Sequence, residues 1–331
     1  MKCAVVGAGA WGTALASLLC ENGHPTTIWA FEPDVADSIN RAQENPRFLA
    51  GVELHADLRA TTDRGDAATG AQCIFYATPS HVLRAVASSM EPWTARDATL
   101  VVATKGIERS RLALMTDVVA EELPGRPVVA LSGPSFAAEV ARRLPTAIVA
   151  ASTDHAAALR VQEVCSSPSF RVYSHDDVTG VELGGALKNV MAVATGICEG
   201  LELGLNARAA LITRGLAEIM RLGTALGARP ATFAGLAGVG DLVLTCTGSL
   251  SRNRSVGLEI GRGASLAEIL AGRETVAEGI VTTESAKALA EREGVDMPIV
   301  TAVHRVLFER QPARWALVEL MRRGLRTEED Q

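Results

Sequence analysis

The sequence is poor in aromatic residues, in paired cysteines and in long apolar runs. Phe, Trp and Tyr make up only 4% of the 331 residues, so Ala, Val and Leu must fill the core. No stretch reaches about 18 consecutive apolar residues, the length that a membrane span requires, so we predict no membrane-spanning segment. The absence of any Cys-x-x-Cys pair argues against a zinc site or a disulfide framework in a chain of this length. We expect reduced, buried thiols at Cys3, Cys20, Cys73, Cys165, Cys198 and Cys246.

An excess of positive charge is also missing. The formal net charge is −6, which argues against a general binder of nucleic acid or of membrane surfaces. An anionic ligand would therefore require Lys and Arg gathered locally. The apolar run that ends at Cys20 shares some features with a signal peptide, but its glycine spacing has a better explanation below, so we expect a cytoplasmic protein.

The length of the chain predicts two domains, because single hydrophobic cores stop growing beyond roughly 250–300 residues. Through the first half, short continuous apolar runs, typical of buried parallel strands, alternate with helical patterns. The expected strands are Cys3–Val6, Thr26–Ala30, Cys73–Ala77, Leu100–Ala103, Val128–Leu131, Ala147–Ala150 and Phe170–Tyr173. The expected helices of this half cover 10–22, 33–44, 80–90, 110–122, 135–143 and 155–165.

From about Val178 onward the strand patterns disappear and helical patterns remain. The expected helices of this half cover 180–203, 206–226, 252–260, 282–293, 297–309 and 312–323. The sequence therefore predicts an α/β fold. A doubly wound (Rossmann) parallel-sheet domain covers residues 1–178, and an all-helical domain covers 179–331.

A glycine-rich turn, Gly7-Ala-Gly9-Ala-Trp-Gly12, follows the first expected strand and opens the first helix. Gly7 allows the tight turn, Gly9 lets the backbone approach a pyrophosphate, and Gly12 lets the helix pack closely on the strand. The helix N-terminus offers N–H groups to phosphate oxygens. Glu32 comes at the end of the second strand, 20 residues after Gly12, where a carboxylate would hold the adenosine ribose hydroxyls. The pattern predicts a dinucleotide site, against the alternative of a glycine-rich turn without a ligand.

The acid at the end of the second strand favours NAD over NADP. No arginine occurs within Phe31-Glu32-Pro33-Asp34 to pair with a 2′-phosphate, and the carboxylate of Glu32 would repel one. The alternative is that Arg41 or Arg47 folds back from the loop after the second helix and neutralises the phosphate, although both lie well past the end of the strand.

Lys105 and a Ser-Gly-Pro-Ser turn follow two further strands of the expected sheet. Lys105 comes directly after a buried strand and before a glycine, at the edge where open α/β sheets bind ligands. Ser132-Gly133-Pro134-Ser135-Phe136 is a strand-to-helix turn with a hydroxyl at its rim. The structural alternatives are a solvated lysine and a helix that begins at a proline.

Lys188 interrupts an apolar helix, with Asn189 beside it and two glycines one turn earlier. A lysine half-buried among apolar residues has a lowered pKa, as a proton-transferring lysine requires. The alternative is a lysine that extends along the helix surface to solvent. Asp241 follows Gly238-Val-Gly240 and begins a helix, so it is either a helix cap or the partner that holds a catalytic lysine.

Ser251-Arg252-Asn253-Arg254 begins another helix, a geometry suited to a phosphate group. The sequence shows no nucleophile–His–acid triad and no cluster of metal ligands, so we predict neither.

These segments together resemble the NAD(P)-dependent glycerol-3-phosphate dehydrogenase family. The resemblance covers residues 7 to 279 in the family's order. It rests on Gly7–Gly12 with the following Thr-Ala-Leu-Ala, Ala103-Thr-Lys105-Gly106, Ser132-Gly-Pro-Ser135-Phe, Gly185-Ala-Leu-Lys188-Asn189, Gly235-Leu-Ala-Gly-Val-Gly-Asp241-Leu, Ser251-Arg252-Asn253-Arg254 and Val276-Ala-Glu278-Gly279.

The resemblance implies interconversion of dihydroxyacetone phosphate and sn-glycerol 3-phosphate for glycerophospholipid synthesis, with Lys188 as proton donor or acceptor and Lys105 and Asp241 assisting it. We also expect a homodimer. The substrate contacts implied are Lys105, Gly133, Ser135, Lys188, Asp241, Ser251, Arg252 and Asn253. The cofactor contacts implied are Ala10, Trp11, Phe31, Lys105, Ala137, Arg252, Val276 and Glu278, beside Gly7, Gly9, Gly12 and Glu32 of the glycine fingerprint.

Two alternatives remain open at the level of sequence. The chain could be another two-domain reductase with a helical second domain, of the 2-hydroxy acid or ketopantoate type. It could also be a dinucleotide sensor without turnover, although a sensor has no use for a proton donor. The choice between NAD and NADP is open too. Many bacterial members of the family carry a basic residue or histidine where this chain has Phe31, whereas Phe31-Glu32 looks more like the NAD-using members.

Overall fold

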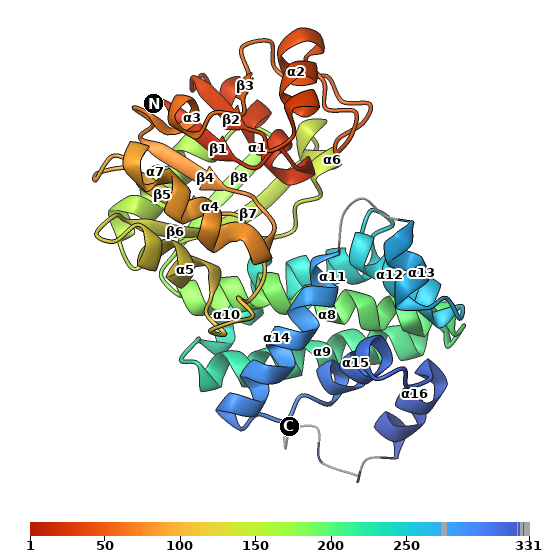
Figure 1. Cartoon of the computed structure of the whole chain (residues 1–331). Coiled ribbons are helices and arrows are strands. Elements are labelled where there is room, and N and C mark those ends of the chain that lie inside the picture. Colours follow the sequence, from red (N-terminus) through yellow and green to blue (C-terminus); the bar gives the residue numbers. More distant parts are fainter. Residues whose placement is uncertain (273–276, 323, 325–326, 328–331) are drawn as a thin grey trace. The chain divides into compact units, whose positions relative to one another are not determined.

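The computed structural model describes residues 1–272, 277–322, 324 and 327, which form two compact units (Figure 1). Unit 1 comprises Met1–Lys105 and Leu114–Val178. Unit 2 comprises Gly106–Ala113 and the described residues of Thr179–Gln331. The predicted boundary after residue 178 does not anticipate that Gly106–Ala113 belongs with the helices, to which Arg109 is joined by an ion pair with Glu284 at 2.7 Å. The assignment of 1–178 as the dinucleotide-binding domain and of 179–331 as the substrate and catalytic domain stays a prediction.

Unit 1 contains an eight-stranded sheet with the order β3-β2-β1-β4-β5-β6-β7-β8. The chain runs from β1 outward to β3 and then returns to β4 beside β1, so the topological switch point lies between β1 and β4. The strands are β1 Cys3–Val6, β2 Thr26–Trp29, β3 Arg59–Thr61, β4 Cys73–Tyr76, β5 Thr99–Val102, β6 Val128–Ser132, β7 Thr146–Ala151 and β8 Phe170–His175.

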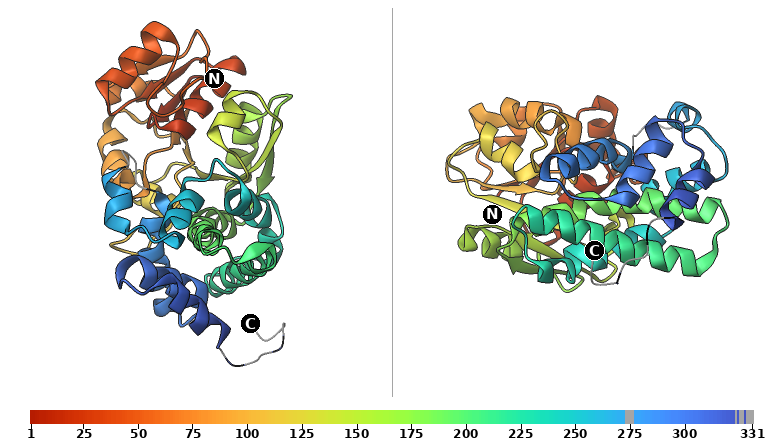
Figure 2. Two further views of the ribbon diagram at one scale, coloured as in Figure 1. Left: turned by 90° about the vertical axis from the view of Figure 1, so that its right-hand side faces the viewer. Right: turned by 90° about the horizontal axis from the view of Figure 1, so that it is seen from below.

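Helices cover the sheet in two groups (Figures 1 and 2). α1 (Ala10–Glu21) packs against α6 (Ala137–Ala141) and α7 (His155–Cys165), whereas α4 (Leu83–Met90) packs against α3 (Arg64–Ala68) and α5 (Met115–Glu122). α2 (Pro33–Ala42) lies against β3, and the short 3₁₀ helices η1 (Ser80–Val82) and η2 (Glu91–Trp93) flank α4. The seven predicted strands are confirmed to within two residues at each end, and the doubly wound arrangement is confirmed.

Four details of the sequence prediction for unit 1 are wrong, one of them being that the five-residue α3 was not expected. β7 runs antiparallel to β6, so the sheet is mixed, because an apolar run reports burial and carries no information on strand direction. β3 was not expected, since a three-residue edge strand that begins with an exposed arginine lacks an apolar run. The helix expected over 110–122 begins only at Met115.

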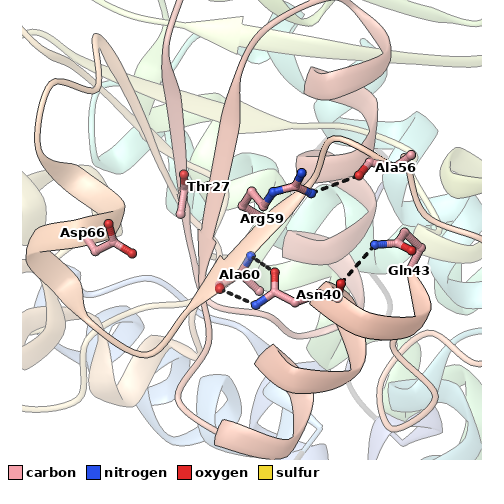
Figure 3. Close-up of a pocket in the computed structure, with 7 residues that line it drawn as sticks. All are labelled: Thr27, Asn40, Gln43, Ala56, Arg59, Ala60 and Asp66. Carbon is pink, nitrogen blue, oxygen red and sulfur yellow. Dashed lines mark hydrogen bonds between the residues drawn. The ribbon is translucent and has the colours of Figure 1, made fainter.

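The side chain of Asn40 fixes α2 to the edge strand β3 (Figure 3). Its Nδ2 donates to the carbonyl of Ala60 at 2.8 Å, and its Oδ1 accepts from the Ala60 N–H at 2.9 Å. A polar pocket of about 580 Å³ lies beside this pair, at the last turn of α2 and away from Glu32, which precedes the first turn. The bonds hold α2, and so its first turn, in register with the sheet.

The described part of Thr179–Gln331 contains helices and no strand, as predicted, whereas Gly106–Ala113 of unit 2 forms no helix. The helices of unit 2 are α8 Val178–Gly200, α9 Gly204–Ala225, α10 Pro230–Phe233, the π-helical η3 Leu236–Gly240, α11 Asp241–Thr247, α12 Arg252–Gly261, α13 Leu266–Ala271, α14 Glu278–Glu293, α15 Pro298–Phe308 and α16 Ala313–Met321. The short α10 and α13 were not expected, because four to six residues give too little periodicity.

α8 is long and apolar enough to cross a membrane by length and composition alone, but 94% of that window is buried inside the protein, as in a core helix. All six cysteines are free and buried, as predicted.

Candidate active site

The glycine-rich turn between β1 and α1 has the backbone geometry that the sequence predicts. Gly7 has a φ of +112°, and a Cβ on Gly12 would lie 1.9 Å from the Gly7 carbonyl oxygen, so only glycine lets α1 begin this close to β1. A Cβ on Gly9 would meet nothing within 4 Å, which leaves open space in front of the first turn of α1. That turn carries no acidic residue, so the positive end of the helix is not neutralised from within.

The residues around this turn fit a dinucleotide. Ala10 is the first residue of α1, and Trp11 follows it with a buried indole Nε1–H that has no hydrogen-bond partner among the described residues. An open backbone surface with helix N–H groups and an orphaned donor beside it suits a pyrophosphate.

Phe31 and Glu32 stand beyond the carboxyl end of β2. The Phe31 ring is 75% exposed and meets Trp29 edge-on, with ring centroids 6.4 Å apart. Glu32 immediately precedes α2, and its carboxylate caps no backbone N–H of that helix. An exposed ring next to a carboxylate, at the end of the strand beside β1, offers an adenine surface and an acceptor for ribose hydroxyls.

Three predicted substrate residues of unit 1 meet at one carbonyl group. Lys105 follows β5, and its Nζ donates to the Gly133 carbonyl at 3.3 Å. Ser135 Oγ donates to the same carbonyl at 3.0 Å, and Ala137 begins α6 two residues later. Gly133 has a φ of +144°, and a Cβ there would lie 2.8 Å from the Cα of Ile148. β1, β4, β5 and β6 are parallel neighbours, so Gly7, Lys105 and Gly133 share the carboxyl edge of the sheet.

In unit 2, Lys188 of α8 donates a hydrogen bond to the carboxylate of Asp241, the first residue of α11. Asp241 is fully buried, and the Lys188 side chain is only 9% exposed, so the lysine does not extend to solvent. The expected hydrogen bond between the two is present, and their catalytic role stays a prediction. The carboxylate favours the charged ammonium, whereas burial alone, on which the sequence argument relied, disfavours it.

Small residues let α8 approach the turn that carries Asp241. Gly184 lies one turn before Lys188 on the same face of α8, and a Cβ there would come within 2.3 Å of the Ala237 carbonyl. Thr245 completes the arrangement, because its Oγ1 donates to the Asp241 carbonyl at 2.6 Å and lies 3.4 Å from the Asp241 carboxylate. Thr245 was not among the site residues predicted from the sequence, although its position one helical turn after Asp241 is a usable signal.

The two arginines of the Ser251–Arg254 segment have different surroundings. Ser251 caps α12 by accepting the Arg254 N–H at 3.2 Å. The Arg254 guanidinium binds both carboxylate oxygens of Glu199, at 3.0 and 2.8 Å. Arg252 is the first residue of α12 and is exposed. An exposed arginine at a helix N-terminus suits an anionic ligand, and the substrate contact of Arg252 stays a prediction.

Asn253 has a structural role that its motif does not reveal. Its Nδ2 donates to Asn189 Oδ1, and its Oδ1 accepts the Gly279 N–H, both at 2.9 Å. The side chain thus ties α12 to the residue beside Lys188 and to the residue after Glu278, which begins α14. Val276, the remaining predicted cofactor contact, lies outside the described residues.

Two family models match the chain. The model described as the NAD-dependent glycerol-3-phosphate dehydrogenase N-terminus matches residues 2–158, and the model of the C-terminus matches residues 177–318.

Individual proteins give the same result over nearly full length. The chain is 52% identical to the glycerol-3-phosphate dehydrogenase [NAD(P)+] of Geobacter sp. (strain M21), over 99% of this chain and 98% of that protein. The crystal structure of glycerol-3-phosphate dehydrogenase from Coxiella burnetii superposes with a TM-score of 0.94 at 40% identity, over 97% of this chain and 99% of that one. A PanE/ApbA family ketopantoate reductase from Ralstonia eutropha JMP134 superposes with a TM-score of 0.63 at 16% identity, over 96% of this chain and 100% of that one, which shows a shared fold alone.

Proposed function

Because this chain belongs to the NAD-dependent glycerol-3-phosphate dehydrogenase family, we propose that Lys188, held by Asp241, exchanges the proton that its reaction requires. The chain is a glycerol-3-phosphate dehydrogenase that uses NAD(P). The substrates follow from that activity: dihydroxyacetone phosphate and sn-glycerol 3-phosphate, which differ by one hydride and one proton. The nicotinamide ring of the cofactor supplies or accepts the hydride.

The proton is the protein's part of the chemistry. When the ketone is reduced, negative charge develops on its oxygen, and the Lys188 ammonium stabilises that charge and then gives up a proton to it. In the reverse direction the neutral amine removes the hydroxyl proton. The buried Asp241 carboxylate, itself fixed by Thr245, keeps the ammonium charged and aimed. This hydrogen bond is the single observation that carries the proposal.

In unit 2, the start of α12 is the part that we expect to bind the phosphate group of the substrate. Arg252 offers a guanidinium fork at a helix N-terminus, where backbone N–H groups add further donors. Lys105 and Ser135, which meet at Gly133, supply positive charge and a hydroxyl at the carboxyl edge of the sheet. Binding energy from the phosphate end then aligns the reacting carbon. For Asn253 the hydrogen bonds to Asn189 and Gly279 support a positioning role in addition to the expected substrate contact.

The cofactor preference we propose is NAD over NADP. Glu32 at the end of β2 accepts hydrogen bonds from ribose hydroxyls and repels a 2′-phosphate. Phe31 covers the adenine, and the open space at Gly9 receives the pyrophosphate.

The direct test is to follow oxidation of NADH and of NADPH in parallel with dihydroxyacetone phosphate, unphosphorylated dihydroxyacetone and 2-keto acids. We expect turnover with the phosphorylated ketone, faster with NADH. Faster turnover of a 2-keto acid or of ketopantoate would contradict the proposal, and so would cofactor binding without any turnover.

Location and assembly complete the proposal. Six free, buried cysteines support a reducing cytoplasmic environment, in which the product enters glycerophospholipid synthesis. A homodimer is supported by large apolar side chains left exposed, such as Leu205 at 71% and Trp315 at 59%. Sedimentation analysis checks the assembly, because a single species of about 35 kDa would contradict a dimer.

A further inference from the structure

We propose that Arg47 recognises the 2′-phosphate of NADPH and so sets how far this chain departs from strict use of NADH. The inference rests on the proposed cofactor site at Gly9 and Glu32. It names the residue that opposes the repulsion from Glu32.

Arg47 lies against the first turn of α2. Its Nη1 is 3.6 Å from the carboxylate of Asp34, which comes two residues after Glu32. The guanidinium also lies over the Phe48 ring, with its central carbon 5.2 Å from the ring centroid. The Arg47 side chain is 38% exposed, and the contacts with Asp34 and Phe48 restrict where the guanidinium can go.

The turn that carries Arg47 is fixed to the glycine-rich loop. Asn45 is fully buried, and its Nδ2 donates both to the Ala8 carbonyl and to Thr13 Oγ1, each at 2.9 Å. The Asn45 Oδ1 accepts the N–H of Phe48 at 3.1 Å. Because Ala8 belongs to the Gly7–Gly12 turn, these bonds place the segment around Arg47 beside the proposed dinucleotide site.

The carboxylates at the start of α2 explain why an NADPH-binding site would need an arginine there. Glu32 and Asp34 both lie at the start of α2, so a 2′-phosphate on a ribose held by Glu32 would meet two carboxylates. A guanidinium binds phosphate through two parallel N–H groups and stays charged at every relevant pH. The Arg47 guanidinium, now between Asp34 and the Phe48 ring, can turn from the Asp34 carboxylate to a phosphate on the neighbouring ribose. NAD lacks that phosphate and gains nothing from it.

Two other arginines serve as comparisons. The Arg41 side chain, on α2, is 81% exposed. Its Nη2 lies 4.0 Å from the carboxylate of Asp37, which comes one helical turn before it. Arg64 begins α3 and lies over the Trp29 ring at 5.0 Å. We expect Arg64 to act on the adenine end through ring stacking, and therefore without regard to the 2′-phosphate.

The experiment measures equilibrium binding of 2′,5′-ADP and of 5′-AMP to the full-length protein by calorimetry. Neither ligand requires turnover. Arg47→Ala should lower the affinity for 2′,5′-ADP about 10- to 100-fold and should change the affinity for 5′-AMP less than about twofold. Arg41→Ala should change the affinity for neither ligand, and Arg64→Ala should change both affinities by the same factor. The kcat/KM for NADPH should fall with the 2′,5′-ADP affinity in Arg47→Ala, while that for NADH stays constant.

Equal losses of both ligands in Arg47→Ala would overturn the inference, since they would show that the side chain only supports Phe48. An unchanged 2′,5′-ADP affinity would overturn it as well, and so would a selective loss in Arg64→Ala. If 5′-AMP fails to bind the unmodified protein, the proposed cofactor site itself is wrong. Normal 5′-AMP binding with no effect of Arg47 removes this inference alone.

Discussion

The buried ammonium of Lys188 donates a hydrogen bond to the buried carboxylate of Asp241. The two residues lie 53 positions apart, on α8 and α11. The glycine at 184 lets α8 approach η3, the element directly before α11, closely enough for the contact. Removing either partner leaves the other as an uncompensated buried charge, which costs about 3–5 kcal/mol in comparable pairs. The pair is therefore expected to respond to mutation as one unit, both in stability and in turnover.

Lys188→Ala should lower kcat by roughly 10²–10⁴-fold and leave the affinity for 5′-AMP unchanged, because the side chain acts on the proton and not on the nucleotide. Steady-state rates with dihydroxyacetone phosphate, beside nucleotide titrations, measure the two effects. Arginine should not restore turnover, since a guanidinium does not release its proton near neutral pH. A Lys188→Ala variant with most of its kcat intact would rule out the assignment.

Asp241→Asn should lower kcat at least tenfold, because the amide keeps the volume of the side chain but no longer stabilises the ammonium. The double variant Asp241→Asn with Lys188→Ala should have a kcat close to that of Lys188→Ala alone, since the two residues act on the same proton. Circular dichroism and thermal unfolding establish that each variant is folded. Fully additive losses in the double variant would show that Asp241 acts independently of Lys188.

Arg252→Ala should raise the KM for dihydroxyacetone phosphate by about tenfold or more, through loss of charge-assisted bonds worth about 1.5–3 kcal/mol. Unphosphorylated dihydroxyacetone, already a poor substrate, should react at an unchanged rate. Arg254→Ala is the matched control: its guanidinium binds Glu199, so we expect lower thermal stability without a selective change in KM. Equal losses with both ketones in Arg252→Ala would mean that Arg252 does not bind phosphate.

Glu218→Gln tests whether a buried carboxyl group outside the proposed active site makes the stability of the protein depend on pH. Glu218 of α9 accepts the backbone N–H groups of Ile299 and Val300 at 2.6 and 3.2 Å and so caps α15. Burial raises the pKa of Glu218 from 4.5 to about 7, and Asp296 adds to the rise, while the two backbone bonds and Arg221 oppose it.

Since the folded state holds the Glu218 proton more tightly than the unfolded chain, this group's contribution to the free energy of unfolding is complete below about pH 4.5. It is lost as the pH rises through about 7. Relative to Glu218→Gln, the unmodified protein should therefore lose up to about 3 kcal/mol between pH 4.5 and 8. Urea unfolding of both proteins across this range measures the difference. Parallel pH profiles would show that Glu218 does not titrate in the folded state.

The parts of the fold that the sequence predicts well are those set by local chemistry. The Gly7–Gly12 turn is recognisable because a tight turn and a close helix each demand glycine at a fixed position. The buried strands of unit 1 are recognisable because both faces are covered, which leaves continuous apolar runs. A short edge strand such as β3 has neither signal, and the antiparallel direction of β7 depends on how the chain returns to the sheet, which no local pattern records.

The same division holds for the candidate site. Lys188 stands out because a charged residue inside an apolar helix is unusual, and Asp241 because it follows glycines. The hydrogen bonds of Asn253 join residues up to 64 positions apart and leave no periodic trace. For the same reason the motif alone could not separate Arg252 from Arg254, whose carboxylate partner Glu199 lies on α8. Long-range pairing is decided by packing, which the structure supplies.

The last prediction concerns the cofactor, for which Glu32 and its neighbour Phe31 are the test positions. A carboxylate about 4 Å from a 2′-phosphate costs roughly 1–4 kcal/mol between water-like and surface-like dielectrics, which corresponds to about a fivefold to several-hundredfold preference for NADH. Arg47 reduces that preference through its position beside Asp34, so we expect the measured ratio of kcat/KM near the lower end. The ratio is measured for the unmodified protein and again after Glu32→Ser combined with Phe31→Arg.

The double change removes the repelling carboxylate and adds a guanidinium at the exposed Phe31 position, so the ratio should fall below one. Phe31→Arg alone should move it less, because Glu32 would then neutralise the new charge. Single and double variants together separate the removal of repulsion from the gain of attraction. If the unmodified protein already prefers NADPH, the argument from Glu32 is wrong. If the double variant keeps the original ratio, Glu32 does not face the ribose, and the acid that ends β2 serves only to begin α2.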